Sequence, residues 1–215
     1  MIGFPFKRVF GLIGGMRVGK DSVANFLTET RGFEQIAFAD QIKEEFGIEK
    51  ADFEAAKIAG NIEELRNKLW EFSAEKRKND PEYFIKKVVK KAIDSDKSVV
   101  ITDIRTPEEF YAFLPIKNSR IYWVHGPSFI TEDFDKNYLL SGSKLPEKMI
   151  IDYACSEETK YKIESIFNNK NGLYDFYKYL DKFFFMEDAR DIWNRPDIRT
   201  LSVYINQFDI RLKGS

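Results

Sequence analysis

Reactive side chains are scarce in this sequence of 215 residues, which holds one cysteine and one histidine. A single cysteine, Cys155, excludes an intramolecular disulfide and leaves a cysteine-based zinc site without a ligand set. Ser-His or Cys-His catalysis would have to pass through His125, whose place at the end of an apolar run favours a structural role. We therefore expect chemistry that needs neither residue.

The sequence also lacks a net charge and a long hydrophobic run. Its 34 basic residues almost balance its 35 acidic residues, so no overall field draws the molecule to nucleic acid or to an anionic membrane. It has no apolar stretch of about 18 residues and no signal-peptide pattern near residue 1. We expect a soluble cytoplasmic protein with no nucleic-acid or membrane partner, and a homodimer stays compatible with the sequence.

Short apolar runs alternate with helical patterns along the first 185 residues. This alternation favours a parallel sheet that is covered by helices on both faces. The predicted strands are residues 9–14, 35–39, 98–102, 120–125 and 165–168. The predicted helices are residues 21–30, 40–46, 51–72, 82–93, 107–113 and 173–185.

A glycine-rich segment follows the first predicted strand and opens the first predicted helix. Its spacing, G-x-x-x-x-G-K, lets backbone N–H groups curl around phosphates while the lysine reaches the β and γ oxygens of a nucleoside triphosphate. We predict donor-nucleotide binding by Gly14, Gly15, Met16, Arg17, Val18, Gly19, Lys20, Asp21 and Ser22.

Asp21 stands where serine or threonine usually follows the lysine of such a loop. A carboxylate is a hard oxygen ligand for Mg²⁺, but an acid at a helix start is also favoured by the helix dipole. Both interpretations stay open, with the Ser22 hydroxyl as the other candidate ligand. Asp103 directly follows the third predicted strand, where a carboxylate organises the metal shell in phosphoryl-transfer enzymes. It could instead cap a turn.

These motifs together resemble the deoxynucleoside monophosphate kinase family of phages and some cellular genomes. The resemblance rests on residues 17–22, 38–43 and 101–105, on Arg66, Arg77 with Asp80-Pro81, and on Glu108-Glu109, Ser156-Glu157 and the turn at 168–172. It spans about residues 9 to 182.

The resemblance implies a role for each matched residue. Lys20, Arg17 and Asp103 would be catalytic, and Asp21 or Ser22 together with Asp103 would organise Mg²⁺ beside ATP. The acceptor nucleotide would contact Asp40, Lys43, Arg66, Arg77 and Arg105. Asn168 and Gly172 would border the donor base, or form a plain turn and helix cap.

The implied fold is a three-layer α/β/α P-loop kinase fold with a mainly parallel five-stranded sheet. Residues 1–185 would form the kinase domain, with a helical acceptor-binding insert over about 40–96 and a lid over about 127–150. Residues 186–215 would form a helical or extended appendage.

The implied activity is ATP- and Mg²⁺-dependent phosphoryl transfer to a deoxynucleoside monophosphate, in deoxynucleotide metabolism. Two alternatives remain. One is a P-loop kinase of another small phosphorylated acceptor, such as dephospho-coenzyme A or phosphomevalonate. The other is a non-catalytic nucleotide-binding or assembly protein.

Overall fold

The computed structural model describes residues 7–15, 18–116, 118–126, 163–168 and 171–193. Within these ranges the chain divides into two compact units, Met1–Asn169 and Lys170–Ser215. The predicted lid over residues 127–150 lies outside the described residues, as does most of the predicted appendage. Among the helices that the structure describes, none is long and apolar enough to cross a membrane.

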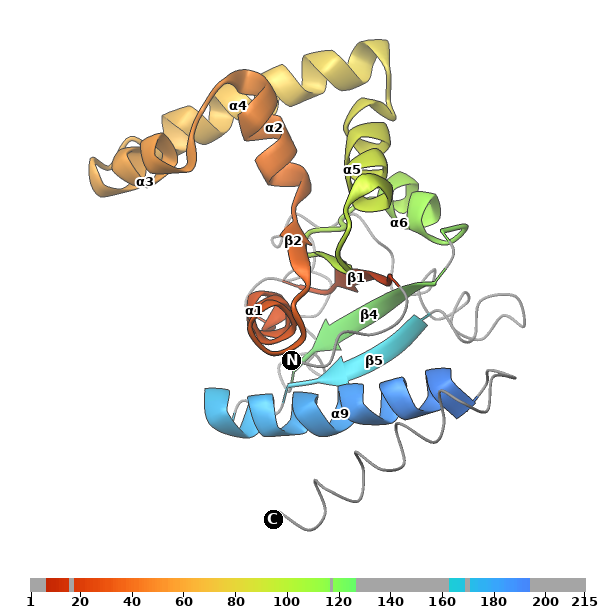
Figure 1. The fold of residues 1–215 in the computed structure, drawn as a ribbon. Helices are drawn as coiled ribbons and strands as arrows, with labels where there is room; N and C mark the ends of the chain where they lie inside the picture. Colours follow the sequence, from red (N-terminus) through yellow and green to blue (C-terminus); the bar gives the residue numbers. More distant parts are fainter. Residues whose placement is uncertain (1–6, 16–17, 117, 127–162, 169–170, 194–215) are drawn as a thin grey trace, which may run out of the picture. The chain divides into compact units, whose positions relative to one another are not determined.

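Five strands of the first unit form one parallel sheet in the order β2-β3-β1-β4-β5 (Figure 1). Their bounds are β1 Val9–Ile13, β2 Glu34–Ile36, β3 Val99–Ile101, β4 Ser119–His125 and β5 Ile163–Phe167. Val9 of β1 pairs with Val99 on one side and with Ser119 on the other, which fixes the register of the sheet centre. The predicted α/β class with a parallel five-stranded sheet is confirmed.

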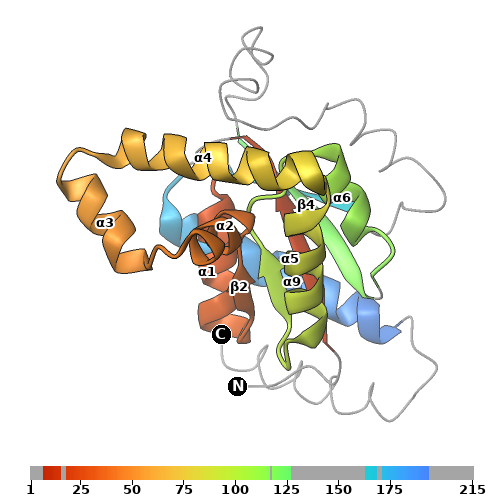
Figure 2. The same ribbon diagram turned by 90° about the horizontal axis from the view of Figure 1, so that it is seen from above.

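The central strands are apolar along their whole length, because helices cover both faces of the sheet (Figures 1 and 2). On one face, side chains such as Val9 and Ile101 share a core with α5 (Tyr83–Asp94) and α6 (Pro107–Phe113). On the other, the Phe10 ring meets Phe33 and Tyr122 near α1 (Lys20–Arg31), which buries Val23, Ala24, Phe26 and Leu27.

Four helices connect β2 to β3: α2 (Phe38–Phe46), α3 (Lys50–Ile58), α4 (Ile62–Asn79) and α5. The single predicted helix over 51–72 is wrong. Gly60 adopts φ 77°, a left-handed conformation, and separates α3 from α4. The predicted extension of the second strand to residue 39 is also wrong, because α2 already begins at Phe38.

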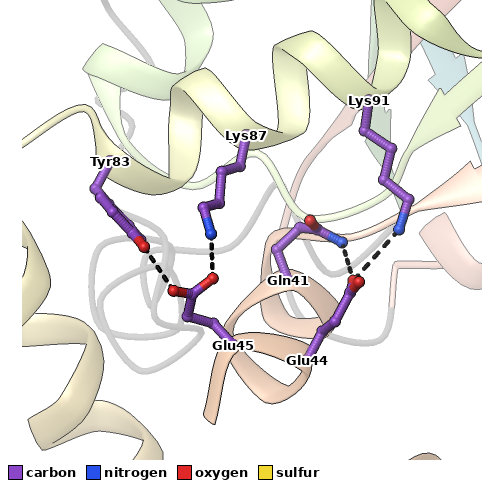
Figure 3. Close-up of polar contacts among 6 residues, drawn as sticks. All are labelled: Gln41, Glu44, Glu45, Tyr83, Lys87 and Lys91. Carbon is purple, nitrogen blue, oxygen red and sulfur yellow. Dashed lines mark hydrogen bonds and ion pairs between the residues drawn. The ribbon is translucent and has the colours of Figure 1, made fainter. Parts of the chain in front are cut away.

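Polar side chains join α2 to α5, as Figure 3 shows. The Tyr83 hydroxyl donates to Glu45 Oε1 at 2.6 Å, and the Lys87 ammonium donates to the other oxygen of Glu45. Glu44, the preceding residue of α2, accepts at Oε2 from Gln41 at 2.9 Å and from Lys91 of α5 at 3.5 Å. These contacts supplement the apolar packing that holds α2 on the sheet domain.

The second unit is described by α9 (Leu173–Trp193), which follows Gly172. Phe176, Leu180 and Phe184 are buried at intervals of four residues and form one apolar stripe. The predicted helix end at residue 185 is eight residues too early.

Candidate functional site

The candidate site lies at the carboxyl ends of β1, the central strand, and its neighbour β3. After β1 the chain crosses to β2 on one side of the sheet, and after β3 it crosses to β4 on the other. Ligands of open α/β sheets bind where the strand order reverses in this way. Both the phosphate loop after β1 and Asp103 after β3 lie at this point.

Two glycines allow the loop after β1 to take its shape. Gly14 has φ 139°, and a Cβ atom there would lie 2.1 Å from the Val124 carbonyl oxygen. Gly19 has φ 107° at the N-cap of α1. Any other residue at these positions would be strained. Met16 and Arg17 lie outside the described residues, whereas Gly15 and Val18 line the described part of the loop.

Lys20, the first residue of α1, turns back over the loop. Its Nζ donates to the carbonyl oxygens of Gly14 at 2.8 Å and Gly15 at 2.5 Å. Burial lowers the pKa of the Lys20 ammonium to about 8, and the nearby Arg105 guanidinium lowers it as well, against the opposing effect of Asp21 and Asp103. A half-buried cation held by carbonyl oxygens is well placed to receive an anionic phosphate.

Asp21 and Ser22 lie in the first turn of α1, with Asp21 exposed and Ser22 half-buried. Both carry hard oxygen atoms, and Asp21 is close enough to raise the Lys20 pKa. Among the described residues no three His, Cys, Asp or Glu side chains gather as ligands for a metal ion. Mg²⁺ in kinases usually needs fewer, because the phosphates of the substrate complete its shell. The residues present therefore fit Mg²⁺.

Asp103 is buried after β3, and its carboxylate caps helix α2. Oδ1 accepts the Phe38 N–H at 2.8 Å and Oδ2 accepts the Ala39 N–H at 3.1 Å. Burial raises the Asp103 pKa, although the two backbone donors and Arg105 partly offset that rise. The turn-cap interpretation expected a local contact, whereas this cap reaches across 65 residues of sequence. Each oxygen keeps a free lone pair, so a water-mediated contact with Mg²⁺ stays compatible with the geometry.

Arg105 lies two residues after Asp103. Its side chain is exposed, and its backbone N–H is held by the Glu109 carboxylate. Glu109 Oε2 accepts the N–H groups of Arg105 at 2.7 Å and Thr106 at 3.1 Å, while Thr106 Oγ1 accepts the Glu109 N–H at 3.3 Å. This capping box starts α6 at Pro107. Burial raises the pKa of Glu109, and the Asp103 charge adds to that rise.

Arg77, near the end of α4, belongs to the same neighbourhood. Its guanidinium carbon lies 5.6 Å from the ring centroid of Phe84, and its charge acts to lower the pKa of Glu109. Arg66 does not join it: it lies on the exposed surface of α4 and pairs with Glu63 of the same helix at 2.6 Å. In the described part of the chain no contact of Arg66 reaches Asp103 or Arg105.

Asp40 and Lys43 form an ion pair of 2.9 Å on α2, and the Lys43 ammonium lies 4.5 Å from the Phe53 ring centroid. The Asp40 charge is near enough to Asp103 to act on its pKa. The structure thus gathers Lys20, Asp21, Asp40, Asp103, Arg105 and Arg77 around the carboxyl ends of β1 and β3.

The two residues predicted beside the donor base fall in different units. Asn168 follows β5, and its side chain contacts the phosphate loop at the Val18 carbonyl oxygen, 3.0 Å away. Gly172 adopts φ 111° before α9, and its carbonyl oxygen accepts the Phe176 N–H at 3.1 Å, as a helix cap does. Cys155 lies outside the described residues. His125 ends β4, beside the Ser165 hydroxyl and the Trp123 and Phe167 rings.

Two contacts that shape the candidate site were not predicted from the sequence. The capping box of Thr106 and Glu109 was readable in the letters T-P-E-E, since a threonine three residues before a glutamate is a known helix-start signal. The bond from Asp103 to Phe38 had no local signal, because it joins residues from distant parts of the chain.

Residues 12–119, half of the chain, match the family model described as phosphomevalonate kinase. Among curated proteins no match is found.

Two solved structures are similar at low identity. One is a sugar kinase from Janibacter sp. HTCC2649, with 12% identity, a TM-score of 0.40, and coverage of 86% of this chain and 98% of that one. The other is TT1252 from Thermus thermophilus, with 15% identity, a TM-score of 0.44, and coverage of 84% and 97%. Neither similarity carries weight for the function.

Proposed function

Because the chain belongs to the phosphomevalonate kinase family, we propose that it transfers the γ-phosphoryl group of ATP to the phosphate of phosphomevalonate, giving the diphosphate. Membership of this family makes the chain a phosphotransferase and an ATP-dependent kinase of a small phosphorylated acceptor. The observation that carries the proposal is the match over residues 12–119, a range that contains the phosphate loop, Arg77, Asp103 and Arg105.

The match supports a phosphomevalonate-type acceptor better than the deoxynucleoside monophosphate that the motif order resembles. Both acceptors end in a phosphate monoester, so both need the same cationic contacts at the transferring end. They differ in the rest of the molecule, which is a short branched carboxylic acid in one case and a nucleoside in the other. The non-catalytic alternative has no support from the family.

In the proposed reaction an acceptor phosphate oxygen attacks the γ-phosphorus in line, and the β–γ bridging oxygen leaves with ADP. The protein positions the two phosphates and offsets charge, and no side chain forms a covalent intermediate. Lys20 would leave the carbonyl oxygens of Gly14 and Gly15 for the donor phosphates. Arg105, which is electrostatically coupled to both Lys20 and Asp103, would hold the acceptor phosphate near the transferring group.

Mg²⁺ would be held by Asp21 or Ser22 together with the ATP phosphates, with Asp103 acting through water since both of its oxygens already accept backbone N–H groups. When bound, the ion supplies positive charge to the β and γ oxygens. Arg77, Asp40 and Lys43 would line the acceptor side.

A coupled ADP-release assay tests the proposal. The acceptors are phosphomevalonate, the four deoxynucleoside monophosphates, the ribonucleoside monophosphates and dephospho-coenzyme A. We expect the highest kcat/KM with phosphomevalonate. A preference for one deoxynucleoside monophosphate would assign the chain to the other acceptor class, and ATP binding without turnover on any of them would remove the proposed reaction.

A further inference from the structure

Asn168 joins three segments at the edge of the phosphate loop. Its backbone N–H donates to the His125 carbonyl oxygen at 2.7 Å, which ties the end of β5 to the end of β4. Its side-chain Nδ2 donates to the Val18 carbonyl oxygen at 3.0 Å, which lies within the loop between Gly14 and Lys20. The amide therefore holds a loop peptide from the side of the sheet.

The orientation of that peptide matters for phosphate binding. In a trans peptide the carbonyl of one residue and the N–H of the next point in opposite directions. A Val18 carbonyl that faces Asn168 therefore directs the Gly19 N–H away from Asn168. The Gly19 carbonyl in turn accepts the Val23 N–H at 3.0 Å as the first bond of α1, so both sides of Gly19 are fixed. The Gly19 N–H is one of the backbone donors that such loops present to phosphate.

The other end of the loop rests on the same strand end. A Cβ atom at Gly14 would contact the Val124 carbonyl oxygen at 2.1 Å, so Gly14 packs directly on the backbone of β4. Val124 precedes His125, the residue that accepts the Asn168 backbone N–H. The end of β4 thus supports the loop directly at Gly14 and, through Asn168, at Val18.

We propose that Asn168 is a positioning residue for the phosphate loop, which holds the Val18–Gly19 peptide with its N–H directed at the donor phosphates. The inference rests on the proposed donor site and deepens it. It differs from a contact with the donor base, because the Nδ2 group acts on the loop backbone and not on the nucleotide. The residue would matter equally for any triphosphate, whatever its base.

The variant Asn168→Asp tests this role, because it keeps the size of the side chain and replaces the amide donor by an oxygen that repels the Val18 carbonyl. Asn25→Asp is the matched control: it adds the same charge on α1, where the side chain is exposed. Asn168→Ser is a second variant that adds no charge. Thermal unfolding selects the variants that keep the wild-type fold.

Two ligands are titrated by calorimetry into each folded protein: ATP, and inorganic tripolyphosphate, which has no base. We expect both dissociation constants to rise by the same factor in Asn168→Asp, roughly tenfold or more for a lost backbone-orienting hydrogen bond beside a charged ligand. Asn168→Ser should show a smaller rise of the same kind, and Asn25→Asp none. In turnover, the KM for ATP should rise while the KM for the acceptor stays unchanged.

Each other result overturns the inference. Weaker ATP binding with unchanged tripolyphosphate binding would place Asn168 at the base. Unchanged binding of both ligands would make it a turn contact without influence on the loop. If the wild-type protein bound neither ligand, the donor site of the proposed function would fail as well, which separates that failure from failure of this inference alone.

Discussion

The carboxylate of Asp103 accepts the backbone N–H of Phe38 at 2.8 Å, although the two residues lie 65 positions apart. Phe38 is the first residue of α2, and its N–H is one of the donors that a helix start leaves without an internal partner. The strand that ends beside the phosphate loop therefore also fixes where the helical segment between β2 and β3 begins.

Replacement of Asp103 by asparagine should destabilise the protein. Both carboxylate oxygens accept backbone N–H groups, and an amide has one oxygen, so either the Phe38 or the Ala39 N–H would face an NH₂ group. We expect Asp103→Asn to lower the free energy of unfolding by about 1–3 kcal/mol, measured by urea denaturation. Asp40→Asn, at an exposed position of α2, the helix that Asp103 caps, serves as the stability control. Wild-type stability in Asp103→Asn would show that the cap contributes nothing.

Replacement of the buried acid Glu109 by glutamine should stabilise the protein, in contrast to Asp103→Asn. Glu109 accepts the Arg105 and Thr106 N–H groups through one oxygen, Oε2, so a glutamine can keep both bonds through its single oxygen. Burial raises the Glu109 pKa, which means that the folded state disfavours the ionised form. We therefore expect Glu109→Gln to stabilise the fold at pH 7.

This gain should depend on pH with a definite sign. A carboxyl group whose pKa is raised in the folded state carries its full penalty above the folded pKa, and none below the unfolded pKa of about 4.3. The difference in thermal midpoint between Glu109→Gln and wild type should shrink as pH falls from 7 to about 4. A gain that stayed constant over this range would have another cause.

Lys20 should couple ATP binding to proton uptake. Its pKa of about 8 means that near pH 8 a substantial fraction of the free protein carries a neutral amine. Bound phosphates favour the ammonium and raise that pKa, so affinity should fall as pH rises above 8. Calorimetry at pH 8 in buffers of different ionisation enthalpy measures the uptake. The phosphate groups are already ionised there, so the signal comes from the protein.

Lys20→Arg and Lys20→Ala provide the comparisons for that measurement. Arginine stays charged at all these pH values, so the Lys20→Arg protein should bind ATP without taking up a proton. The Lys20→Ala protein should fold, bind ATP weakly and show almost no phosphoryl transfer. Unchanged turnover in folded Lys20→Ala would remove the phosphate-loop assignment.

Arg77→Lys should weaken acceptor binding and leave ATP binding unchanged. A guanidinium can form two parallel bonds to a phosphate, which an ammonium cannot. We expect a loss of about 1.5–3 kcal/mol in the kcat/KM for the acceptor. Arg31→Lys is a matched control, since Arg31 lies 5.9 Å from the Phe26 ring centroid much as Arg77 lies over Phe84, but at the far end of α1. A loss confined to ATP titrations would move Arg77 to the donor side.

The sequence was most informative where one local pattern determines one local structure. The G-x-x-x-x-G-K spacing placed Gly14, Gly19 and Lys20 at a strand-to-helix turn, and the structure has that turn. Apolar runs located all five strands, with ends displaced by up to three residues. The break at Gly60 was missed, because helical periodicity continues on both sides of that residue.

The site was less predictable because its contacts are long-range. Arg66 and Arg77 looked equivalent in the basic stretch of one helix, yet Arg77 reaches the Phe84 ring and Arg66 pairs on the surface. Asn168 resembled a residue near a base, and its contact with the Val18 carbonyl depends on a register between β4 and β5 that no local pattern reveals. The family match over residues 12–119 supports a different acceptor class from the deoxynucleoside monophosphate that the order of the motifs resembles.

The strand order also affects how the chain folds during synthesis. β1 and β2 are neighbours in sequence but not in the sheet, where β3 lies between them. In chain order, the first strand that pairs with β1 is β3, where Val9 pairs with Val99, and β2 also pairs with β3. Neither early strand can therefore pair until the helical segment and β3 have been translated. At a synthesis rate of roughly 5–20 residues per second, β1 stays unpaired for about 5–18 seconds. During that time the nascent chain carries an apolar strand without its sheet partner, which is an aggregation-prone segment until residues near Val99 are made.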